Sequence, residues 1–385
     1  MSNIPEGYKQ TEVGILPEDW EVKKLEEVGE ALIGLTYSPS DVASEGILVL
    51  RSSNIQNGML SFGDNVYVKS EVPDRIMVRT GDILICVRNG SRDLIGKSTV
   101  LDNRANGMTF GAFMSVFRST YTKYLAHFFK SHIFLSQVEQ HLGATINQIT
   151  NASIYSFIAP LPPLPEQHAI AEALADADAL IAAQERLIAK KQAIKQGAMQ
   201  ELLTGRRRLE GFEGVWDIRP IGELLKIRHG KNQREVEVSD GTIPILATGG
   251  QIGVAATPLY SKPSVLIGRK GTINKPQYIE KPFWTVDTLF YSEILGDNSA
   301  KFLYYVFTNI DWMQFNEASG VPSLNARTIE AVEIACPLPA EQHAIAVILS
   351  DMDAEIEALE QRLSKMRALK QGMMQELLTG RTRLI

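Results

Sequence analysis

One long segment occurs twice in this chain. Residues 166–209 and 341–384 align without a gap at an offset of 175 positions, and 28 of the 44 aligned residues are identical. Each copy follows a Pro-Leu-Pro sequence, at 163–165 and 337–339, where proline favours the end of an extended segment and the start of a helix. A long internal repeat of this kind implies two structural units built on the same plan.

Both copies have the residue spacing of a long helix. In the second copy, apolar residues recur every three or four positions from Ile345 to Leu377, which is the heptad pattern of a coiled coil. The first copy keeps this register from Ile170 to Leu202, with small or polar residues at several seam positions. Acidic residues gather in the first half of each helix and basic residues in the second. We therefore expect an antiparallel coiled coil, although the periodicity alone also fits ordinary amphipathic core helices.

The segments around the repeats have similar layouts and different sequences. Each opens with a tryptophan, Trp20 or Trp216, and continues with short apolar runs separated by Gly, Ser and Asn, which is typical of strands and turns. The runs predict strands at 47–50, 83–87, 113–117, 243–247, 265–267 and 289–291. A short helix is expected before each Pro-Leu-Pro, at 120–141 and 299–317.

The predicted fold class is therefore α+β. Two α/β domains, at 1–160 and 210–335, are separated by long antiparallel helices at 161–209 and 336–385, with pseudo-two-fold symmetry. No apolar run is long enough to span a bilayer, and the N-terminus lacks the pattern of a signal peptide, so we expect a cytoplasmic protein without membrane association. Cys86 and Cys336 lie in apolar contexts, which favours buried free thiols, and no metal-ligand spacing occurs.

The net charge of −6 by itself argues against nucleic-acid binding. Basic and amide side chains nevertheless gather in Gly- and Asn-rich turns next to the predicted strands of both variable domains. Arginine and lysine bind phosphates or guanine, and Asn or Gln binds adenine. The candidate DNA-binding residues are Arg51, Asn54, Arg88, Asn89, Arg92, Lys97, Arg228, Lys231, Arg234, Gln251, Arg269, Lys270 and Lys275. Solvated turns are the alternative interpretation, and the acidic background predicts weak DNA binding by the chain alone.

The ends of the two repeats are nearly identical. A shared partner at both copies explains this better than helix packing does, because packing does not require identical helix ends. The candidate interface residues are Gln167, His168, Thr204, Arg206, Gln342, His343, Thr379 and Arg381. For the two histidines, helix capping or an interface is expected in preference to catalysis.

Motifs for catalysis are incomplete. Gly96-Lys97-Ser98 resembles part of a phosphate-binding loop, but Ser91 stands where that loop needs its first glycine. The Asp/Asn-Pro-Pro-aromatic tetrapeptide of amino-methyltransferases does not occur. We therefore predict no catalytic residue, cofactor site or metal site. Two alternatives to a DNA-binding subunit stay open: a fused methyltransferase or nuclease, and a scaffold that only assembles other proteins.

The series Pro-Leu-Pro, Glu-Gln-His-Ala-Ile-Ala, heptad helix and Glu-Leu-Leu-Thr-Gly-Arg resembles the specificity subunits of type I restriction–modification systems. The resemblance implies that each variable domain reads one half of a split target in double-stranded DNA. It implies as partners two methyltransferase subunits and two restriction/translocase subunits, with S-adenosylmethionine, ATP and Mg²⁺ bound only there. A helix from Ile345 to Leu377 is on the order of 50 Å long, which would suit half-sites about one to one and a half turns of DNA apart, at roughly 34 Å per turn.

Overall fold

The computed structural model describes residues 4–69, 71–143 and 146–384. The chain forms two compact units: unit 1 comprises residues 1–183 and 363–385, and unit 2 comprises residues 184–362. Each unit holds one variable domain together with part of both long helices. The helices are therefore shared between the two units and are not compact bodies of their own.

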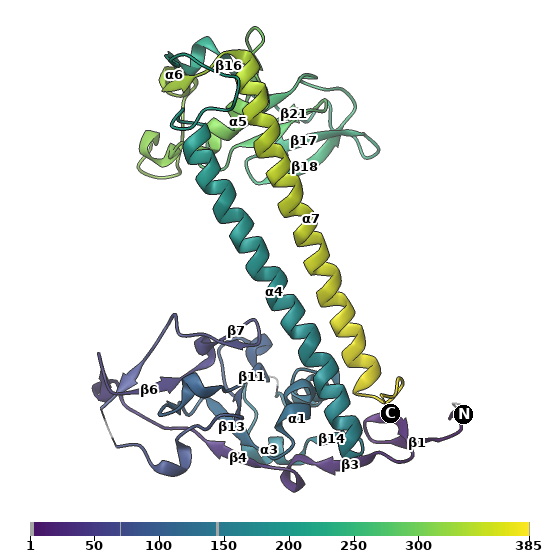
Figure 1. The fold of residues 1–385 in the computed structure, drawn as a ribbon. Coiled ribbons are helices and arrows are strands. Elements are labelled where there is room, and N and C mark those ends of the chain that lie inside the picture. The colour runs from purple at the N-terminus through teal and green to yellow at the C-terminus, as the bar shows by residue number, and fades with distance from the viewer. Residues whose placement is uncertain (1–3, 70, 144–145, 385) are drawn as a thin grey trace. The chain divides into compact units, whose positions relative to one another are not determined.

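The two repeats form helices of 39 residues each, α4 (Leu164–Leu202) and α7 (Pro339–Leu377), which lie side by side in Figure 1. In unit 2, Lys191 Nζ lies 2.6 Å from Glu355 Oε1, and Lys195 pairs with Asp353. As the position along α4 increases, the position of its partner along α7 decreases. The helices are therefore antiparallel, as predicted. They pair within one chain here, which the sequence had left open.

Ion pairs between the helices occur at repeated positions. Lys370 binds Asp178 in unit 1 at 2.5 Å, and these residues are related by the 175-residue offset to Lys195 and Asp353 of unit 2. The polar seam positions of α4 make direct contacts as well: Gln184 Nε2 donates to the carbonyl of Leu359 at 3.0 Å. Polar residues in the first repeat's seam therefore bind the facing helix in place of apolar packing.

The variable domain of unit 1 contains two four-stranded sheets. One has the order β11 (Ser98–Val100), β10 (Ile83–Cys86), β13 (Met114–Arg118), β4 (Glu30–Ile33) and is antiparallel. The other has the order β12 (Thr109–Phe110), β6 (Ile47–Leu50), β9 (Tyr67–Val68), β5 (Val42–Ala43), with β12 parallel to β6. Three two-stranded pairs join β1 (Tyr8–Thr11) to β2 (Gly14–Pro17), β3 (Glu21–Lys24) to β14 (Ile158–Leu161), and β7 (Ile55–Gln56) to β8 (Met59–Leu60). The helices are α1 (Thr122–Phe128), α2 (His132–His141) and α3 (Asn151–Ser156).

The variable domain of unit 2 repeats much of this plan (Figure 1). Its antiparallel sheet has the order β16 (Leu225–Arg228), β22 (Leu289–Ile294), β19 (Ser264–Gly268), β20 (Gln277–Ile279). A three-stranded sheet has the order β18 (Gly250–Ala255), β17 (Ile243–Ala247), β21 (Trp284–Thr285). The pair β15 (Asp217–Pro220) and β23 (Glu333–Cys336) corresponds to β3 and β14, and the helices are α5 (Ala300–Asn309) and α6 (Ala326–Ala331). All six predicted strands are present, which confirms the predicted α+β class.

The predicted helix at 120–141 is in fact two helices. The chain breaks at Ser131, whose hydroxyl accepts a hydrogen bond from the Phe134 amide at 3.3 Å and so caps α2. The break lets Phe129 and Phe134 pack against each other, with ring centroids 4.8 Å apart, in a core that also includes Ile170 and Leu377 from the long helices. Burial of this apolar surface fixes the domain onto the start of α4 and the end of α7.

Both cysteines are buried free thiols, as predicted. Burial raises the pKa of the Cys86 thiol to about 11, so it stays protonated and unreactive near neutral pH.

Candidate functional site

A buried carboxylate in the first turn of α4 ties three distant segments of unit 1 together. Glu166 is fully buried. Arg383 donates to it from Nε at 2.7 Å and from Nη2 at 2.8 Å, and the indole N–H of Trp20 donates at 3.0 Å. Arg383 also binds Asp19, and these hydrogen bonds lower the pKa of the Asp19 carboxyl. We call Glu166, Arg383, Trp20 and Asp19 the unit 1 clasp.

Unit 2 contains the same arrangement at the equivalent positions of the repeat. Glu341 accepts from Arg208 at 2.6 and 2.7 Å and from the Trp216 indole at 3.1 Å. Three residues before Arg208 and Arg383, a glycine has a positive φ, +69° at Gly205 and +65° at Gly380, which turns the chain back toward the tryptophan. The near identity of the repeat ends therefore has an explanation inside each unit. Sequence reasoning missed both clasps, although the paired Trp, Glu and Arg were visible signals.

Two predicted interface residues are in the interior, which corrects the prediction for them. The Gln342 side chain is fully buried, accepts from the Ser299 amide at 2.9 Å and donates to the Pro337 carbonyl at 3.0 Å. Gln167 is buried and donates to the Pro162 carbonyl at 2.8 Å. These amides hold the Pro-Leu-Pro segments against the helix starts. The Gln342 side chain is therefore not accessible to a partner, whereas Gln167, although buried, borders a groove of unit 1.

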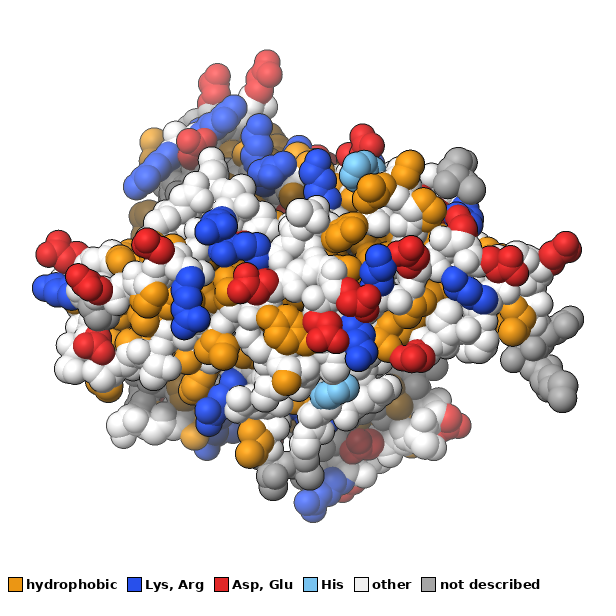
Figure 2. Space-filling view, turned by 90° about the horizontal axis from the view of Figure 1, so that it is seen from below, with side chains coloured by type: hydrophobic (Ala, Val, Ile, Leu, Met, Phe, Trp, Pro, Cys, Tyr) orange, Lys and Arg blue, Asp and Glu red, His pale blue; other side chains and the backbone are white. Residues whose placement is uncertain are grey.

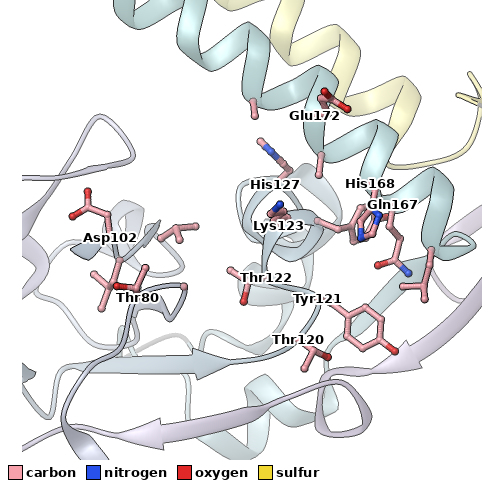
Figure 3. A pocket seen from close by; sticks show the side chains of 17 residues that line it. Thr80, Asp102, Thr120, Tyr121, Thr122, Lys123, His127, Gln167, His168 and Glu172 are labelled. Atoms are coloured by element: carbon pink, nitrogen blue, oxygen red, sulfur yellow. The ribbon is translucent and has the colours of Figure 1, made fainter. Parts of the chain in front are cut away.

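The predicted interface histidines lie in matching grooves, one in each unit. In unit 1, a groove of about 1030 Å³ is lined by Lys123 and His127 of α1, by His168 and Glu172 of α4, and by residues 80–81 and 100–102 (Figure 3). In unit 2, a groove of about 530 Å³ includes His343, which is related to His168 by the repeat offset. Three further pairs of groove residues obey the same offset: Ala171 and Ala346, Glu172 and Val347, Ala175 and Ser350. The repeats thus present equivalent concave surfaces.

The other predicted interface residues lie at the helix ends. Thr204 and Thr379 bond to the carbonyls of Gln200 and Gln375, each at 2.5 Å. Arg206 and Arg381 are exposed. Their charged side chains are therefore accessible, whereas the hydroxyls are occupied locally.

Several predicted DNA-binding side chains bind groups within their own unit. Arg51 pairs with Asp64 at 2.8 Å, Arg92 with Glu139 at 2.7 Å and Arg228 with Glu293 at 2.8 Å. Amide and lysine side chains also have local partners: Asn89 donates to Ser52 Oγ at 3.1 Å, Lys97 to the Ser52 carbonyl at 3.5 Å, and Gln251 to the Gly253 carbonyl at 3.2 Å. The positive charge that these arginines offer to DNA is reduced by their carboxylate partners.

Asn54 is a correction to the predicted DNA-binding set. Its side chain is fully buried, accepts from the Arg51 amide at 2.9 Å and donates to the Ser61 carbonyl at 2.9 Å. It holds the turn after β6 together and is not accessible to DNA.

Other predicted cations are not neutralised. Within the described residues no carboxylate pairs with Arg88, Lys97, Lys231, Arg234, Arg269, Lys270 or Lys275. On the face shown in Figure 2, acidic and basic side chains are intermixed and do not form a field of one sign.

The two basic turns with unpaired cations occupy equivalent backbone positions. In unit 1, the amides of Val87 and Arg88 both donate to the carbonyl of Phe113, at 3.0 and 3.1 Å. In unit 2, the amides of Arg269 and Lys270 donate in the same way to Thr288, at 2.8 and 3.3 Å. Arg88 and Lys270 also form matching isolated bridges to Gln148 and Ser323, which the 175-residue offset relates. The turn of each domain therefore makes the same set of backbone contacts within its own unit.

The described residues contain neither a metal-binding cluster nor a membrane-spanning helix. In the described ranges, no group of three or more His, Cys, Asp or Glu side chains is arranged to hold a metal ion. None of the helices described is both long and apolar enough to cross a membrane.

Comparison with known proteins gives a consistent family. Residues 17–194 and 213–366 match the model for the type I restriction modification DNA specificity domain. The chain is 32% identical over 252 residues to the type I restriction enzyme EcoKI specificity subunit of Escherichia coli, covering 60% of this chain and only 54% of that protein. It is 25% identical to the putative type I restriction enzyme MjaX specificity subunit of Methanocaldococcus jannaschii, covering 98% of this chain and 97% of the relative.

Solved structures agree on the fold. The crystal structure of the S subunit of a type I restriction–modification system from M. genitalium matches with a TM-score of 0.62 at 16% identity, over 93% of this chain and 96% of the other. A chain from a study of complex assembly and conformational transition of the type I R-M system matches with a TM-score of 0.59 at 18% identity, over 95% of this chain and 99% of the other. Because the family model covers most of both halves, the chain belongs to the specificity subunits of type I restriction–modification systems.

Proposed function

We propose that this chain recognises a bipartite target in double-stranded DNA, with one half read by each unit, and that it has no catalytic activity of its own. The observation that carries the proposal is the pair of equivalent turns, in which Arg88 and Lys270 are presented on the same backbone framework without a carboxylate partner in the described residues. A duplicated framework with different side chains is suited to reading two different half-sites.

The same proposal includes the partner subunits. Two methyltransferase subunits dock on the duplicated surfaces that contain His168 and His343, and two restriction/translocase subunits join them. The matching grooves support one equivalent docking site in each unit. S-adenosylmethionine, ATP and Mg²⁺ bind to those partners, which carry out methylation, translocation and cleavage.

Methylome sequencing tests the DNA-reading role. Cells with the gene should methylate a motif with two specified halves and an unspecified spacer, and cells without it should lose that methylation. Methylation that is unchanged by loss of the gene contradicts the proposal. Methylation by the purified chain with S-adenosylmethionine alone would favour the fused-enzyme alternative.

The docking role needs a separate experiment. H168E places an acidic side chain in the groove of unit 1 beside Glu172, and H343E makes the same change in unit 2. Each single variant should reduce the number of bound methyltransferase subunits from two to one in native mass spectrometry of the co-expressed complex. The matched control is K69E, which changes an exposed residue outside both grooves. Unchanged stoichiometry in H168E and H343E would argue against docking at the grooves.

A further inference from the structure

The basic turn of unit 1 stacks on an exposed aromatic ring. The guanidinium carbon of Arg88 lies 4.9 Å from the centroid of the Phe113 ring. Phe113 directly precedes β13 and is 56% exposed, whereas Phe117, four residues later, is fully buried. A large aromatic side chain that is held in solvent at a strand end loses the hydrophobic stabilisation of burial, which suggests a binding role.

The charge of Arg88 is available to a ligand. No carboxylate or other hydrogen-bond acceptor binds its guanidinium group within the described residues. Arg104 offers a matched contrast, since it lies 5.7 Å from the Phe62 ring centroid but is neutralised by Asp102 at 2.8 Å. Stacking on Phe113 restricts the guanidinium plane while its edge donors stay free, which is the arrangement needed for a bidentate acceptor.

A cleft beside this stack contains unpaired polar atoms. It has a volume of about 470 Å³, and its lining includes Phe113, Tyr37, Arg51, Ser53 and Asp64, whose carboxylate pairs with Arg51 Nη2. Arg51 Nε and Ser53 Oγ are buried atoms without a hydrogen-bond partner in the described structure. A buried polar atom without a partner loses its hydration and gains no hydrogen bond in return, so it destabilises the free protein. The cleft and the stack therefore favour a ligand rich in hydrogen-bond acceptors, as DNA is.

Unit 2 carries different chemistry at the same backbone positions. Lys270 replaces Arg88, and Thr288 replaces Phe113. The neighbouring loops, by contrast, expose similar β-branched residues at equivalent positions, Ile146 at 61% and Val321 at 65%. The residue pair at the turn therefore distinguishes the two units, whereas the exposed residue of the loop does not.

We propose that Arg88 and Phe113 are the base-reading pair of unit 1. Arg88 donates two hydrogen bonds to O6 and N7 of a guanine in the major groove, and the Phe113 ring lies against the C5-methyl group of an adjacent thymine. These are the acceptor pair and the apolar group that arginine and an aromatic ring recognise on base edges. Lys270 and Thr288 occupy the corresponding reading position in unit 2. This inference rests on the proposed function and specifies the residues that determine one half-site.

Selection from a randomised double-stranded DNA library tests the pair. The full-length chain is used at about 50 mM salt, where phosphate contacts retain even weak complexes. The wild-type chain should enrich a bipartite motif with a guanine next to a thymine in one half. R88A should reduce the preference for that guanine on the order of 10-fold or more, and F113A should reduce the preference for the thymine by a smaller factor. The other half should be unchanged in both variants, and K270A should alter that half only.

Two further variants separate base reading from overall charge and from arginine–aromatic contacts in general. R88K retains the positive charge and loses the two-donor edge, so it should lose the guanine preference while keeping most of the overall affinity. R104A removes an arginine of the same unit that also lies near an aromatic ring and should leave both halves unchanged. If R88A, R88K and F113A all select the same motif as the wild-type chain, the inference is wrong and the proposed function still stands. A wild-type chain that enriches no motif overturns both.

Discussion

The clasp of unit 1 allows a quantitative prediction. Replacing Arg383 with alanine leaves the fully buried Glu166 carboxylate with two hydrogen-bond donors among the described residues, the Trp20 indole and the Leu384 amide. Removing one partner of a buried ion pair typically costs 3–5 kcal/mol, because the other charge stays desolvated. The Arg383 side chain is 23% exposed, so water can partly replace it. We expect R383A to cost about 3 kcal/mol, at the lower end of that range. The lost contact with the half-exposed Asp19 adds little.

Hydrogen exchange measured by mass spectrometry locates this loss. The first turns of α4 and residues 8–20 should exchange on the order of 100-fold faster, since each 1.4 kcal/mol corresponds to a factor of about ten. E166Q in the R383A background should restore part of the protection, because the buried group is then neutral. R208A should produce the equivalent loss at the start of α7, where Glu341 is left unpaired.

R381A is the matched control, because Arg381 is two residues away and largely exposed. R381A should change the free energy of the opening that permits exchange by less than about 0.5 kcal/mol. Two results would contradict this prediction: hydrogen exchange in R383A that is no faster than in R381A, or exchange in the R383A/E166Q double variant that is faster than in R383A.

Three further predictions concern stability. Burial lowers the pKa of His127 to about 4, so between pH 6.5 and pH 4 the unfolded chain binds a proton that the folded chain does not. The free energy of unfolding should therefore decrease as the pH is lowered through this window, by about 2 kcal/mol at pH 5. Urea unfolding of H127F should lack this pH-dependent component. G34A places a methyl group 2.2 Å from the Gly111 carbonyl oxygen and should cost about 1–3 kcal/mol in thermal unfolding, while G63A, with open space around it, should cost little. Q342L leaves the Ser299 amide without its acceptor and should lower the free energy of unfolding by about 1–3 kcal/mol. Hydrogen exchange at the start of α5 should become faster than in the control variant H343L, and equal exchange rates in the two variants would contradict this prediction.

The sequence by itself determined the features that depend on local periodicity. The repeat offset, the two long helices, the strands of both variable domains and the family all followed from patterns within short stretches of chain. A heptad or an alternating run constrains its own burial, because side-chain direction follows directly from the backbone period. The same reasoning placed Cys86 and Cys336 in the interior.

The tertiary structure decided which polar residues are available for function. Arg92 and Arg88 belong to the same turn, yet Arg92 is paired with Glu139, 47 residues away, and Arg88 stacks on Phe113 with its donors free. The near identity of the helix ends predicts a shared partner, and the structure adds that Arg383, next to one of these ends, binds Glu166 across 217 positions of sequence. Sequence patterns do not encode such pairings, since an ion pair depends on which distant side chains the fold brings within about 4 Å. The repeat therefore determined the architecture, and long-range contacts determined which of its charged residues remain unpaired and accessible.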